Sequence, residues 1–384
     1  MKSKEFVIDS KTYSSGQVLV IAELGSSHSG DPVKARELID AASEAGADCI
    51  KFQIVYANEI LHPNTGEVAL PGGKIRLYDR FKALEQPLSF FAEMKEMVEK
   101  KGLVFLCTPF GLKSARELYS LNPKCIKIAS PELNFTALLR EIASYKLPTL
   151  LSSGVSSLSD IGEAMEILGE GQNEGQNIEE RQNICLLHCV TAYPAPETDY
   201  NLRLLENLSS IFSISVGISD HSLDPCLVPA LGTAMGASVI EKHFCLSRKE
   251  GGLDDPIALE PAAFAQMVAA IRKASKTPPK EVIEGYSSER GKDLVKNILG
   301  DGEKCLAPSE TANYGRTNRS IHALRQIEKG ELIERDMFAC LRTEKNLRPG
   351  LSPSLEEWLI GRLAKDTIPG GEGIRREDVA ETQA

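Results

Sequence analysis

The sequence predicts an α/β fold, a (β/α)8 TIM barrel followed by a small C-terminal domain. Three observations lead to this prediction. A short apolar strand, a loop and an amphipathic helix recur eight times between residues 18 and 275, the repeat number of such a barrel. Almost every one of these strands ends in polar residues. The alternation stops past residue 276, where short strand-like stretches and turns follow. A doubly wound sheet is the alternative architecture.

The elements can be placed in chain order, beginning with residues 5–17, which are expected to form a hairpin or cap. Strands are predicted at 18–23, 47–53, 103–108, 124–130, 148–153, 184–190, 214–219 and 238–244. Helices are predicted near 32–45, 88–101, 112–120, 135–145, 158–168, 201–210, 225–235 and 261–275. Asp31 and Asp224 each precede a proline, a pattern that favours a helix start.

The domain organisation follows from these patterns. The barrel domain is predicted at 1–280, a linker at 281–315 and the small domain at 316–384. The small domain is too short for a large core of its own and is expected to lean on the barrel or on a partner chain. Residues 54–87 are an unusually long loop, which suggests a lid or wall over the barrel mouth. The polar stretch 169–183 is expected to be a solvated excursion.

Composition restricts the possible functions and locations. The formal net charge is −10 with no long run of lysine and arginine, so a nucleic acid is not an expected partner. The nine cysteines include no CxxC pair, and several lie in apolar runs, which is typical of reduced core thiols. The N-terminus lacks the apolar core of a signal peptide, and no apolar run is long enough to cross a membrane. A cytoplasmic protein without a membrane partner is expected.

Polar side chains at the strand ends are the main functional signal. Leaving such groups buried without partners would cost several kcal/mol each. In a barrel the carboxyl ends of the strands converge on one mouth, where active sites lie. The candidate residues at or just beyond the strand ends are Glu23, Lys51, Gln53, Thr108, Lys127, Ser130, Ser152, Thr191, Ser219, Glu241 and His243.

Two histidines are candidates for a metal site. His221 follows the seventh strand and His243 ends the eighth, so both imidazoles can reach one point at the mouth. Nitrogen and oxygen ligands without a thiolate suit Mn²⁺, Co²⁺ or Mg²⁺ better than a structural zinc ion. The spacing alone fits a pair of solvated or core histidines equally well.

Eight motifs follow one another along the barrel part of the chain: IAELGSSHSGD, IKFQ, CTPF, IKIASPE, LLSSG, LLHCVTAYPAP, GISDHS and IEKHF. In this order they resemble the motifs of the sialic acid synthase (N-acetylneuraminate or nonulosonate synthase) family. The tail NRSIHALRQIEKGELI with LRPGLSP is similar to the family's antifreeze-like SAF domain, a β-clip fold. The resemblance covers nearly the whole chain. It implies a synthase that condenses phosphoenolpyruvate with an N-acetylated mannosamine-type or 2,4-diacetamido-trideoxyhexose sugar, for surface polysaccharide biosynthesis.

The resemblance also implies roles for individual residues. His221 and His243 would hold a divalent metal, usually Mn²⁺. Contacts to phosphoenolpyruvate would come from Lys51, Thr108, Lys127, Ser130, Ser152 and Ser219, with Gln53 and Tyr193 nearby. Glu23, Glu132 and Asp254 would handle the acceptor sugar or its reacting end, and Glu241 would be a carboxylate beside the metal. Arg319 would cross a domain-swapped homodimer to meet the acyl group of the sugar.

Departures from the sialic acid branch concern the acceptor. Thr191 stands where that branch has an asparagine, and Leu253 and Asp255 replace a proline and a histidine around Asp254. Both segments look closer to the bacterial branches that make pseudaminic or legionaminic acid or a spore-coat sugar. Two other functions remain open at this point. One is a phosphoenolpyruvate-dependent synthase acting on a phosphorylated aldose, and the other is a non-catalytic sugar-binding protein.

Overall fold

The barrel predicted from the sequence is present in the computed structural model, which describes residues 4–70, 73–170 and 183–380. Eight parallel strands form one sheet in the order β7-β4-β3-β12-β11-β10-β9-β8, and β7 and β8 lie side by side, so the sheet nearly closes. The alternative of an open, doubly wound sheet is therefore wrong. The strands are β3 (Leu19–Glu23), β4 (Cys49–Ile54), β7 (Val104–Pro109), β8 (Ile126–Ile128), β9 (Thr149–Ser152), β10 (Ile184–Cys189), β11 (Ser215–Asp220) and β12 (Val239–His243).

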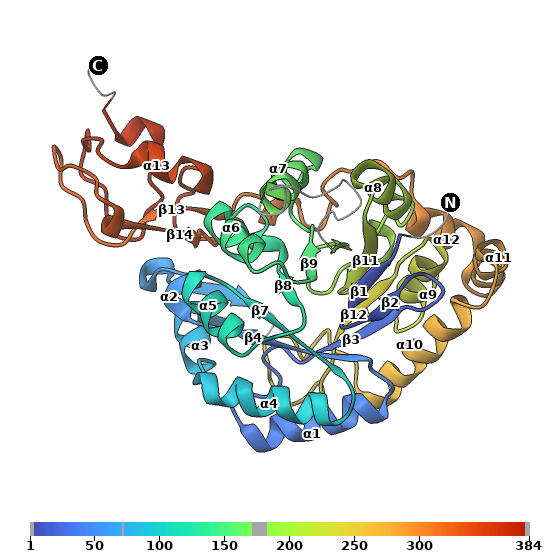
Figure 1. Cartoon of the computed structure of the whole chain (residues 1–384). Helices are drawn as coiled ribbons and strands as arrows, with labels where there is room; N and C mark the ends of the chain where they lie inside the picture. Colours follow the sequence, from blue (N-terminus) through green and yellow to red (C-terminus); the bar gives the residue numbers. More distant parts are fainter. Residues whose placement is uncertain (1–3, 71–72, 171–182, 381–384) are drawn as a thin grey trace.

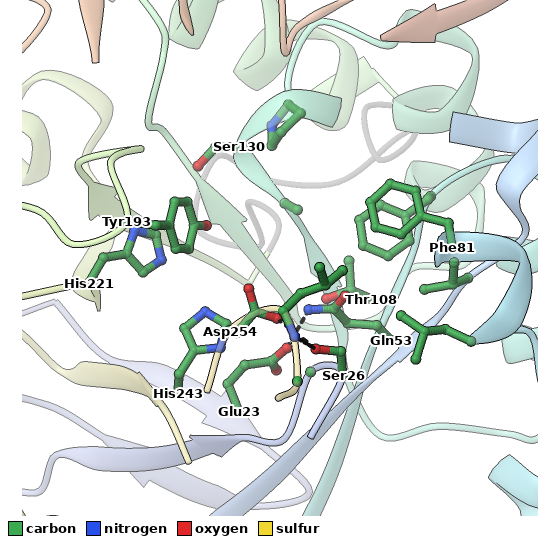
Figure 2. Close-up of a pocket in the computed structure, with 18 of the residues that line it drawn as sticks. Glu23, Ser26, Gln53, Phe81, Thr108, Ser130, Tyr193, His221, His243 and Asp254 are labelled. Carbon is green, nitrogen blue, oxygen red and sulfur yellow. Dashed lines mark hydrogen bonds between the residues drawn. The ribbon is translucent and has the colours of Figure 1, made fainter. Parts of the chain in front are cut away.

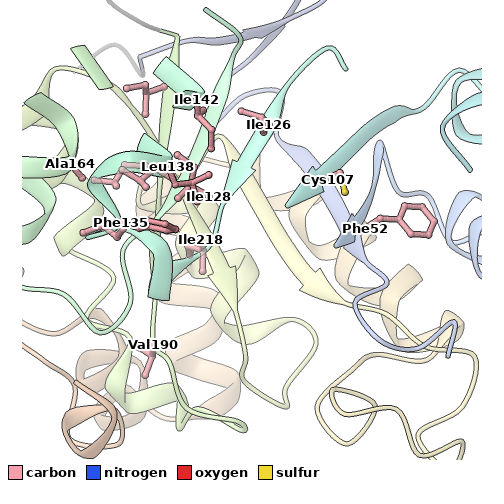
Figure 3. Packing of buried hydrophobic residues seen from close by; sticks show 14 of the residues in the cluster. Phe52, Cys107, Ile126, Ile128, Phe135, Leu138, Ile142, Ala164, Val190 and Ile218 are labelled. Atoms are coloured by element: carbon pink, nitrogen blue, oxygen red, sulfur yellow. The ribbon is translucent and has the colours of Figure 1, made fainter. Parts of the chain in front are cut away.

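Helices surround the barrel, as Figure 1 shows. They are α1 (Pro32–Glu44), α4 (Leu88–Lys100), α5 (Leu112–Ser120), α6 (Thr136–Ser144), α7 (Leu158–Glu170), α8 (Leu204–Phe212), α9 (Leu227–Ala234) and α10 (Pro261–Ala274). Asp31 caps α1 by accepting a hydrogen bond from the backbone N–H of Val33 at 2.8 Å. Apolar residues on the outer faces of the strands pack against these helices, as Ile128 does beside Leu138 in Figure 3.

The inner face of the barrel is apolar at the end where the strands begin, opposite the mouth. The N-terminal hairpin of β1 (Phe6–Ile8) and β2 (Lys11–Tyr13) contributes three buried side chains to this layer, which confirms the predicted cap. The layer consists of Phe6, Ile8, Tyr13, Leu19, Ile21, Cys49, Leu106, Cys125, Leu150, Cys185, Leu187 and Val239. The hairpin therefore closes the end of the barrel opposite the mouth.

The long segment after β4 forms part of the mouth. It contains α2 (Ala57–Ile60), the hairpin of β5 (Glu67–Leu70) and β6 (Gly73–Arg76), and α3 (Leu77–Ala83). The predicted solvated excursion at 169–183 lies almost wholly outside the described residues. No helix in the described ranges is long and apolar enough to cross a membrane.

The predicted linker is largely ordered helix. It contains most of α11 (Pro279–Arg290) and all of α12 (Lys292–Leu299), whose residues Val295 and Ile298 are buried in the main core. The C-terminal domain follows, with antiparallel β13 (Arg319–Ala323) and β14 (Phe338–Arg342), the short helix α13 (Glu356–Leu359) and several isolated bridges. It docks beside α2 and α6 (Figure 1).

Candidate active site

One cavity of about 670 Å³ lies at the carboxyl ends of the barrel strands, a size typical of small-molecule sites. Figure 2 draws 18 of its residues, with His221, His243 and Glu23 among those labelled. The predicted site residues that line it are Glu23, Lys51, Gln53, Thr108, Lys127, Ser130, Ser152, Thr191, Tyr193, Ser219, His221, Glu241, His243 and Asp254. Glu132 and Arg319 are absent from the lining.

Strand alternation explains how these side chains come together. On β3, Leu19 and Ile21 point into the apolar interior, and Glu23 is the next residue on the same face. On β4, Cys49 occupies the interior and Lys51 follows at the mouth. Most of the other strands follow the same pattern, so an apolar layer supports a polar layer directly above it; β11 is an exception, with Ser215 and Gly217 before Ser219.

Opposite charges lie in direct contact on the floor of the cavity. Lys51 Nζ lies 2.8 Å from Glu241 Oε1 and 3.2 Å from Glu23 Oε2. Burial alone would lower the pKa of Lys51, but the two carboxylates outweigh it and raise that pKa above its usual value. Ser219 donates a hydrogen bond to Glu241 Oε1 at 2.9 Å. Lys51 is therefore held as a cation.

Lys127 is a second cation on this floor, with a weaker hold on its proton. Its Nζ donates to Ser152 Oγ at 2.6 Å and lies 3.9 Å from Glu241. Burial lowers the pKa of Lys127 to about 8, against the opposing effect of Glu241. For Glu241, burial would raise the pKa, but Lys127 and Lys51 lower it to about 2. An anionic ligand would stabilise the charge on Lys127.

Glu23 is suited to proton exchange near neutral pH. Burial raises its pKa to about 7, even though Lys51 acts in the opposite direction. Gln53 donates to the other oxygen, Oε1, at 2.5 Å, which fixes the orientation of the carboxyl group.

Several buried polar atoms around this floor lack hydrogen-bond partners within the described part of the chain. They are Oγ1 of Thr108, Oε2 of Glu241 and Oε2 of Glu23, which has only its ionic contact with Lys51. Buried polar atoms are rarely left unpaired in folded proteins. These atoms are therefore in place for a ligand that supplies both donors and acceptors.

The two predicted histidines meet at one side of the cavity, with ring centroids 5.6 Å apart. Nδ1 of His221 lies 2.8 Å from the carbonyl oxygen of Val190, so Nδ1 carries the proton and Nε2 is left as a ligand. Burial lowers the pKa of His243, which keeps its imidazole neutral. Tyr193 stacks on His221 at 4.2 Å between centroids.

The surroundings of the histidines fit a metal ion with open positions. A Cβ atom added to Gly25 would lie 3.0 Å from Oδ2 of Asp254 and 3.6 Å from Nδ1 of His243, so glycine leaves space between two potential ligands. Across the ranges that the structure describes, no group of three or more His, Cys, Asp or Glu side chains is arranged to hold a metal. Two imidazoles are one fewer than the three protein ligands of a typical catalytic zinc site, so a metal held here would take its remaining ligands from substrate or water.

The structure gives Glu132 and Arg319 a place behind the cavity wall. Glu132 ends the 3₁₀ turn Ser130–Glu132, and its side chain is fully buried. Its Oε1 accepts from Arg319 and also from Arg342, each at 2.8 Å. Arg319 is fully buried too, and its NH2 group donates to the carbonyl oxygen of Phe110 at 2.6 Å. Neither residue lines the cavity of the single chain, and the roles implied by the family resemblance, which place Arg319 in a partner's cavity, stay predictions.

Arg342, which the sequence analysis did not single out, is an arginine of the C-terminal domain that lines the cavity. It lies opposite Arg319 across the β13–β14 pair, lines the cavity and keeps 12% of its side chain exposed. Directly opposite residues of an antiparallel pair lie on the same face, so the docking of the domain on the barrel decides which arginine lines the cavity.

The segment after β4 supplies an apolar wall, as its length suggested. The cavity is lined by Ile75, Leu77, Phe81 and Leu84 from this segment, together with the partly buried Arg80. The NH2 group of Arg80 donates to the carbonyl oxygen of Gly251 at 2.9 Å, which joins this wall to the loop after β12.

Comparison with known proteins agrees with this arrangement. Residues 38–281 match the NeuB family and residues 318–380 match the SAF domain. An uncharacterized protein of Methanocaldococcus jannaschii is 37% identical over 85% of this chain and 86% of its own. The N,N'-diacetyllegionaminic acid synthase of Campylobacter jejuni is 31% identical over 94% of this chain and 99% of its own.

A solved structure shows the same two-domain architecture. The spore coat polysaccharide biosynthesis protein of Bacillus subtilis superposes with a TM-score of 0.79 at 31% identity, covering 99% of this chain and all of the other. The family match spans most of the barrel, and the relatives align over nearly the full length. This chain therefore belongs to the NeuB family and carries a C-terminal SAF domain.

Proposed function

We propose that this protein is a nonulosonic acid synthase. It condenses phosphoenolpyruvate with an N-acetylated sugar and releases inorganic phosphate by C–O cleavage. The observation that carries this proposal is the floor of the cavity, where two buried lysines stand among hydroxyl groups and unpaired polar atoms. The relative named as an N,N'-diacetyllegionaminic acid synthase supports the same class of reaction.

Phosphoenolpyruvate is the natural ligand for this floor because it carries a phosphate dianion and a carboxylate. Lys127 provides a cation whose charged form an anion would stabilise. Ser130, Ser152 and Thr108 place hydroxyl donors on the same floor. Lys51 is committed to Glu23 and Glu241, so it neutralises these carboxylates and keeps them from repelling the substrate.

The reaction forms one carbon–carbon bond and breaks one carbon–oxygen bond. Carbon 3 of phosphoenolpyruvate attacks the aldehyde carbon of the sugar, whose oxygen becomes a hydroxyl group, and carbon 2 becomes cationic. Glu241, ionised at neutral pH, stabilises that cation. Water adds to carbon 2 and loses a proton to Glu23, whose pKa of about 7 suits this transfer. The phosphate then leaves with the electron pair of the C–O bond, and carbon 2 becomes a ketone as its hydroxyl group loses the second proton of the water. Of the two water protons, one replaces, through Glu23, the proton taken up by the sugar oxygen, and the other leaves on the phosphate.

A divalent metal held by His221 and His243 belongs to this proposal, with Mn²⁺ the most favoured ion and Mg²⁺ or Co²⁺ as alternatives. Its contribution would be Lewis-acid polarisation of the sugar aldehyde. The neutral imidazole of His243 and the free Nε2 of His221 support this assignment.

The upper part of the cavity favours an acceptor with apolar substituents. Ile75, Leu77, Phe81 and Leu84 form a wall that a methyl group can contact but a hydroxyl group cannot pair with. A 2,4-diacetamido-trideoxyhexose has a methyl group at carbon 6 and a second acyl methyl group, whereas N-acetylmannosamine has hydroxyl groups at both places. We therefore expect the trideoxy sugar to be the better acceptor.

The domain-swapped homodimer remains a prediction. In this single chain Arg342 and Arg319 reach Glu132 of the same chain, and an exchange of C-terminal domains would place the same ion pairs between two chains. Mixing the inactive variants His221→Ala and Arg342→Glu tests this. In a swapped heterodimer one mouth carries both defects and the other carries none, so activity should return. A monomer in sedimentation, or no recovery after verified exchange, contradicts the swap.

A phosphate-release assay with phosphoenolpyruvate and a panel of sugars tests the function itself. The panel contains the diacetamido-trideoxyhexoses, N-acetylmannosamine and phosphorylated aldoses, with and without Mn²⁺, and mass spectrometry identifies the product. We expect metal-dependent release only with unphosphorylated N-acetylated sugars. Turnover restricted to phosphorylated aldoses, or no turnover with any sugar, would reject the proposal.

A further inference from the structure

The segment between α12 and the C-terminal domain contacts the barrel through one buried carboxylate. Glu310 is 1% exposed, and its Oε2 accepts hydrogen bonds from the backbone N–H groups of Val155 at 3.0 Å and Thr191 at 2.9 Å. Its Oε1 accepts from the N–H of Ala307 at 3.2 Å, within its own segment. Val155 follows β9 and Thr191 follows β10, so one oxygen joins two neighbouring loops of the mouth.

The carbonyl groups of the same two residues are also held by this segment. Asn313 donates from Nδ2 to the carbonyl oxygen of Thr191 at 3.0 Å, and Asn318 donates to that of Val155 at 3.0 Å. Both loop residues thus have N–H and C=O satisfied from outside the barrel. Because each loop lies beyond the end of its strand, these bonds replace the ladder bonds that the strands no longer provide.

The loop that carries Thr191 has little room to move. A Cβ atom on Gly154 would lie 2.2 Å from Oγ1 of Thr191 and 3.0 Å from Oγ of Ser130, so the two loops approach as closely as glycine permits. Gly154 also donates its N–H to Ser130 Oγ at 3.0 Å. Val155 has a φ of +44°, a conformation that a β-branched residue adopts only when its surroundings impose it.

We propose that Glu310 is a positioning residue for the acceptor sugar. It acts by fixing the backbone of Thr191, whose side chain lines the cavity. This inference rests on the proposed function, because it takes the acceptor as the ligand that Thr191 meets. Its consequence is that a residue in a connecting segment, with no place in the cavity lining, contributes to the choice of acceptor.

The test compares variants of two acids in the same segment. Glu310→Ala removes the three hydrogen bonds that the carboxylate accepts from backbone N–H groups. Glu310→Gln keeps the shape of the side chain but provides a neutral oxygen, which accepts a weaker hydrogen bond than a carboxylate does. Glu303→Gln is the matched control, because Glu303 is exposed and loses the same charge. Hydrogen exchange of the peptides spanning 154–157 and 189–193 reports on the loops without any need for activity.

We expect exchange in both peptides to rise in Glu310→Gln and more in Glu310→Ala, and not in the control. The KM for the acceptor should rise about tenfold in Glu310→Gln, the factor for one weakened charged hydrogen bond, with kcat and the KM for phosphoenolpyruvate changing less. In a Thr191→Ala background the effect of Glu310→Gln on the acceptor KM should shrink, since the two act as a unit.

Unchanged exchange in Glu310→Gln and Glu310→Ala overturns the inference, as does raised exchange with an unaltered acceptor KM. An equal rise in both KM values, or full additivity with Thr191→Ala, assigns Glu310 a general structural role and also overturns it. If the wild-type protein turns over no sugar at all, the proposed function fails instead, and the acceptor assignment fails with it. The exchange data then decide separately whether Glu310 holds the two loops.

Discussion

Replacing Arg319 and Arg342 of the β13–β14 pair one at a time should separate an effect on protein stability from an effect on substrate recognition. Arg319 is fully buried, and its guanidinium bonds Glu132 and three backbone carbonyl groups. Removing one partner of a buried ion pair costs about 3–5 kcal/mol. In Arg319→Ala, Arg342 still pairs with Glu132, so the loss arises from the three carbonyl groups that lose their donor and from a buried carboxylate that keeps a single, partly exposed partner. Arg319→Ala should therefore lower the free energy of unfolding by about that amount.

Arg342→Ala should cost little stability but should weaken binding of the acceptor sugar. Arg319 still neutralises Glu132 in that variant, and Arg342 keeps 12% of its side chain exposed, so the loss of stability should be no more than about 1–2 kcal/mol. Its NH1 group makes no hydrogen bond within the described residues and is available to an acyl carbonyl of the sugar. The KM for the acceptor should rise about tenfold or more.

Urea unfolding and steady-state kinetics on the same preparations decide between these roles. Arg325→Ala is the control, since Arg325 is an exposed arginine of the same domain that pairs with Glu331, and it should behave like wild type. The reasoning is refuted if Arg319→Ala unfolds like wild type yet raises the acceptor KM more than Arg342→Ala does. Arg319 would then be the residue that meets the sugar, as the family resemblance implied.

Three further predictions concern the floor and the metal. His221→Ala and His243→Ala should each abolish turnover with added Mn²⁺ while the circular dichroism spectrum is kept, and near-normal activity in both would remove the metal from this position. Lys127→Met should lose more than about 2 kcal/mol of transition-state stabilisation, measured as kcat/KM for phosphoenolpyruvate, and an unchanged value would exclude Lys127 from the site. Glu23 has its pKa raised from 4.5 to about 7 in the folded protein, so the folded state binds its proton more tightly than the unfolded chain does. The free energy of unfolding should therefore fall as pH rises from 4.5 to about 7. Glu23→Gln should remove that fall, and it should also remove an inflection near pH 7 in the pH profile of kcat/KM. If the inflection survives the substitution, the titration belongs to another group.

The barrel and most of its mouth could be predicted because strand alternation is a local property. Once Leu19 and Ile21 are placed inside, Glu23 must follow on the same face, and the same logic places Lys51 and Glu241. All eight strands lie within two or three residues of their predicted ends.

The contribution of the C-terminal half could not be predicted in the same way. Whether Arg319 or Arg342 faces the cavity depends on how a small domain docks on the barrel, which no periodicity encodes. Glu310 lies in a stretch that reads as a linker, and an acid there is normally solvated. Its burial arises from two distant loops whose N–H groups need an acceptor, a condition visible only in the folded chain.

The N-terminal hairpin has a consequence for the sequence of binding events. Phe6, Ile8 and Tyr13 fill the far end of the barrel, so within the described residues we expect substrates to enter and products to leave through the mouth. The charged floor lies deepest, and the apolar wall and Arg342 stand between it and the solvent. In the reaction proposed above, a sugar seated against that wall would block the way to the floor, so we expect phosphoenolpyruvate to bind first and the sugar second. Dead-end inhibition by an unreactive sugar analogue should then be uncompetitive toward phosphoenolpyruvate. A noncompetitive pattern would mean that phosphoenolpyruvate reaches the floor even when the sugar position is filled, and would contradict this order.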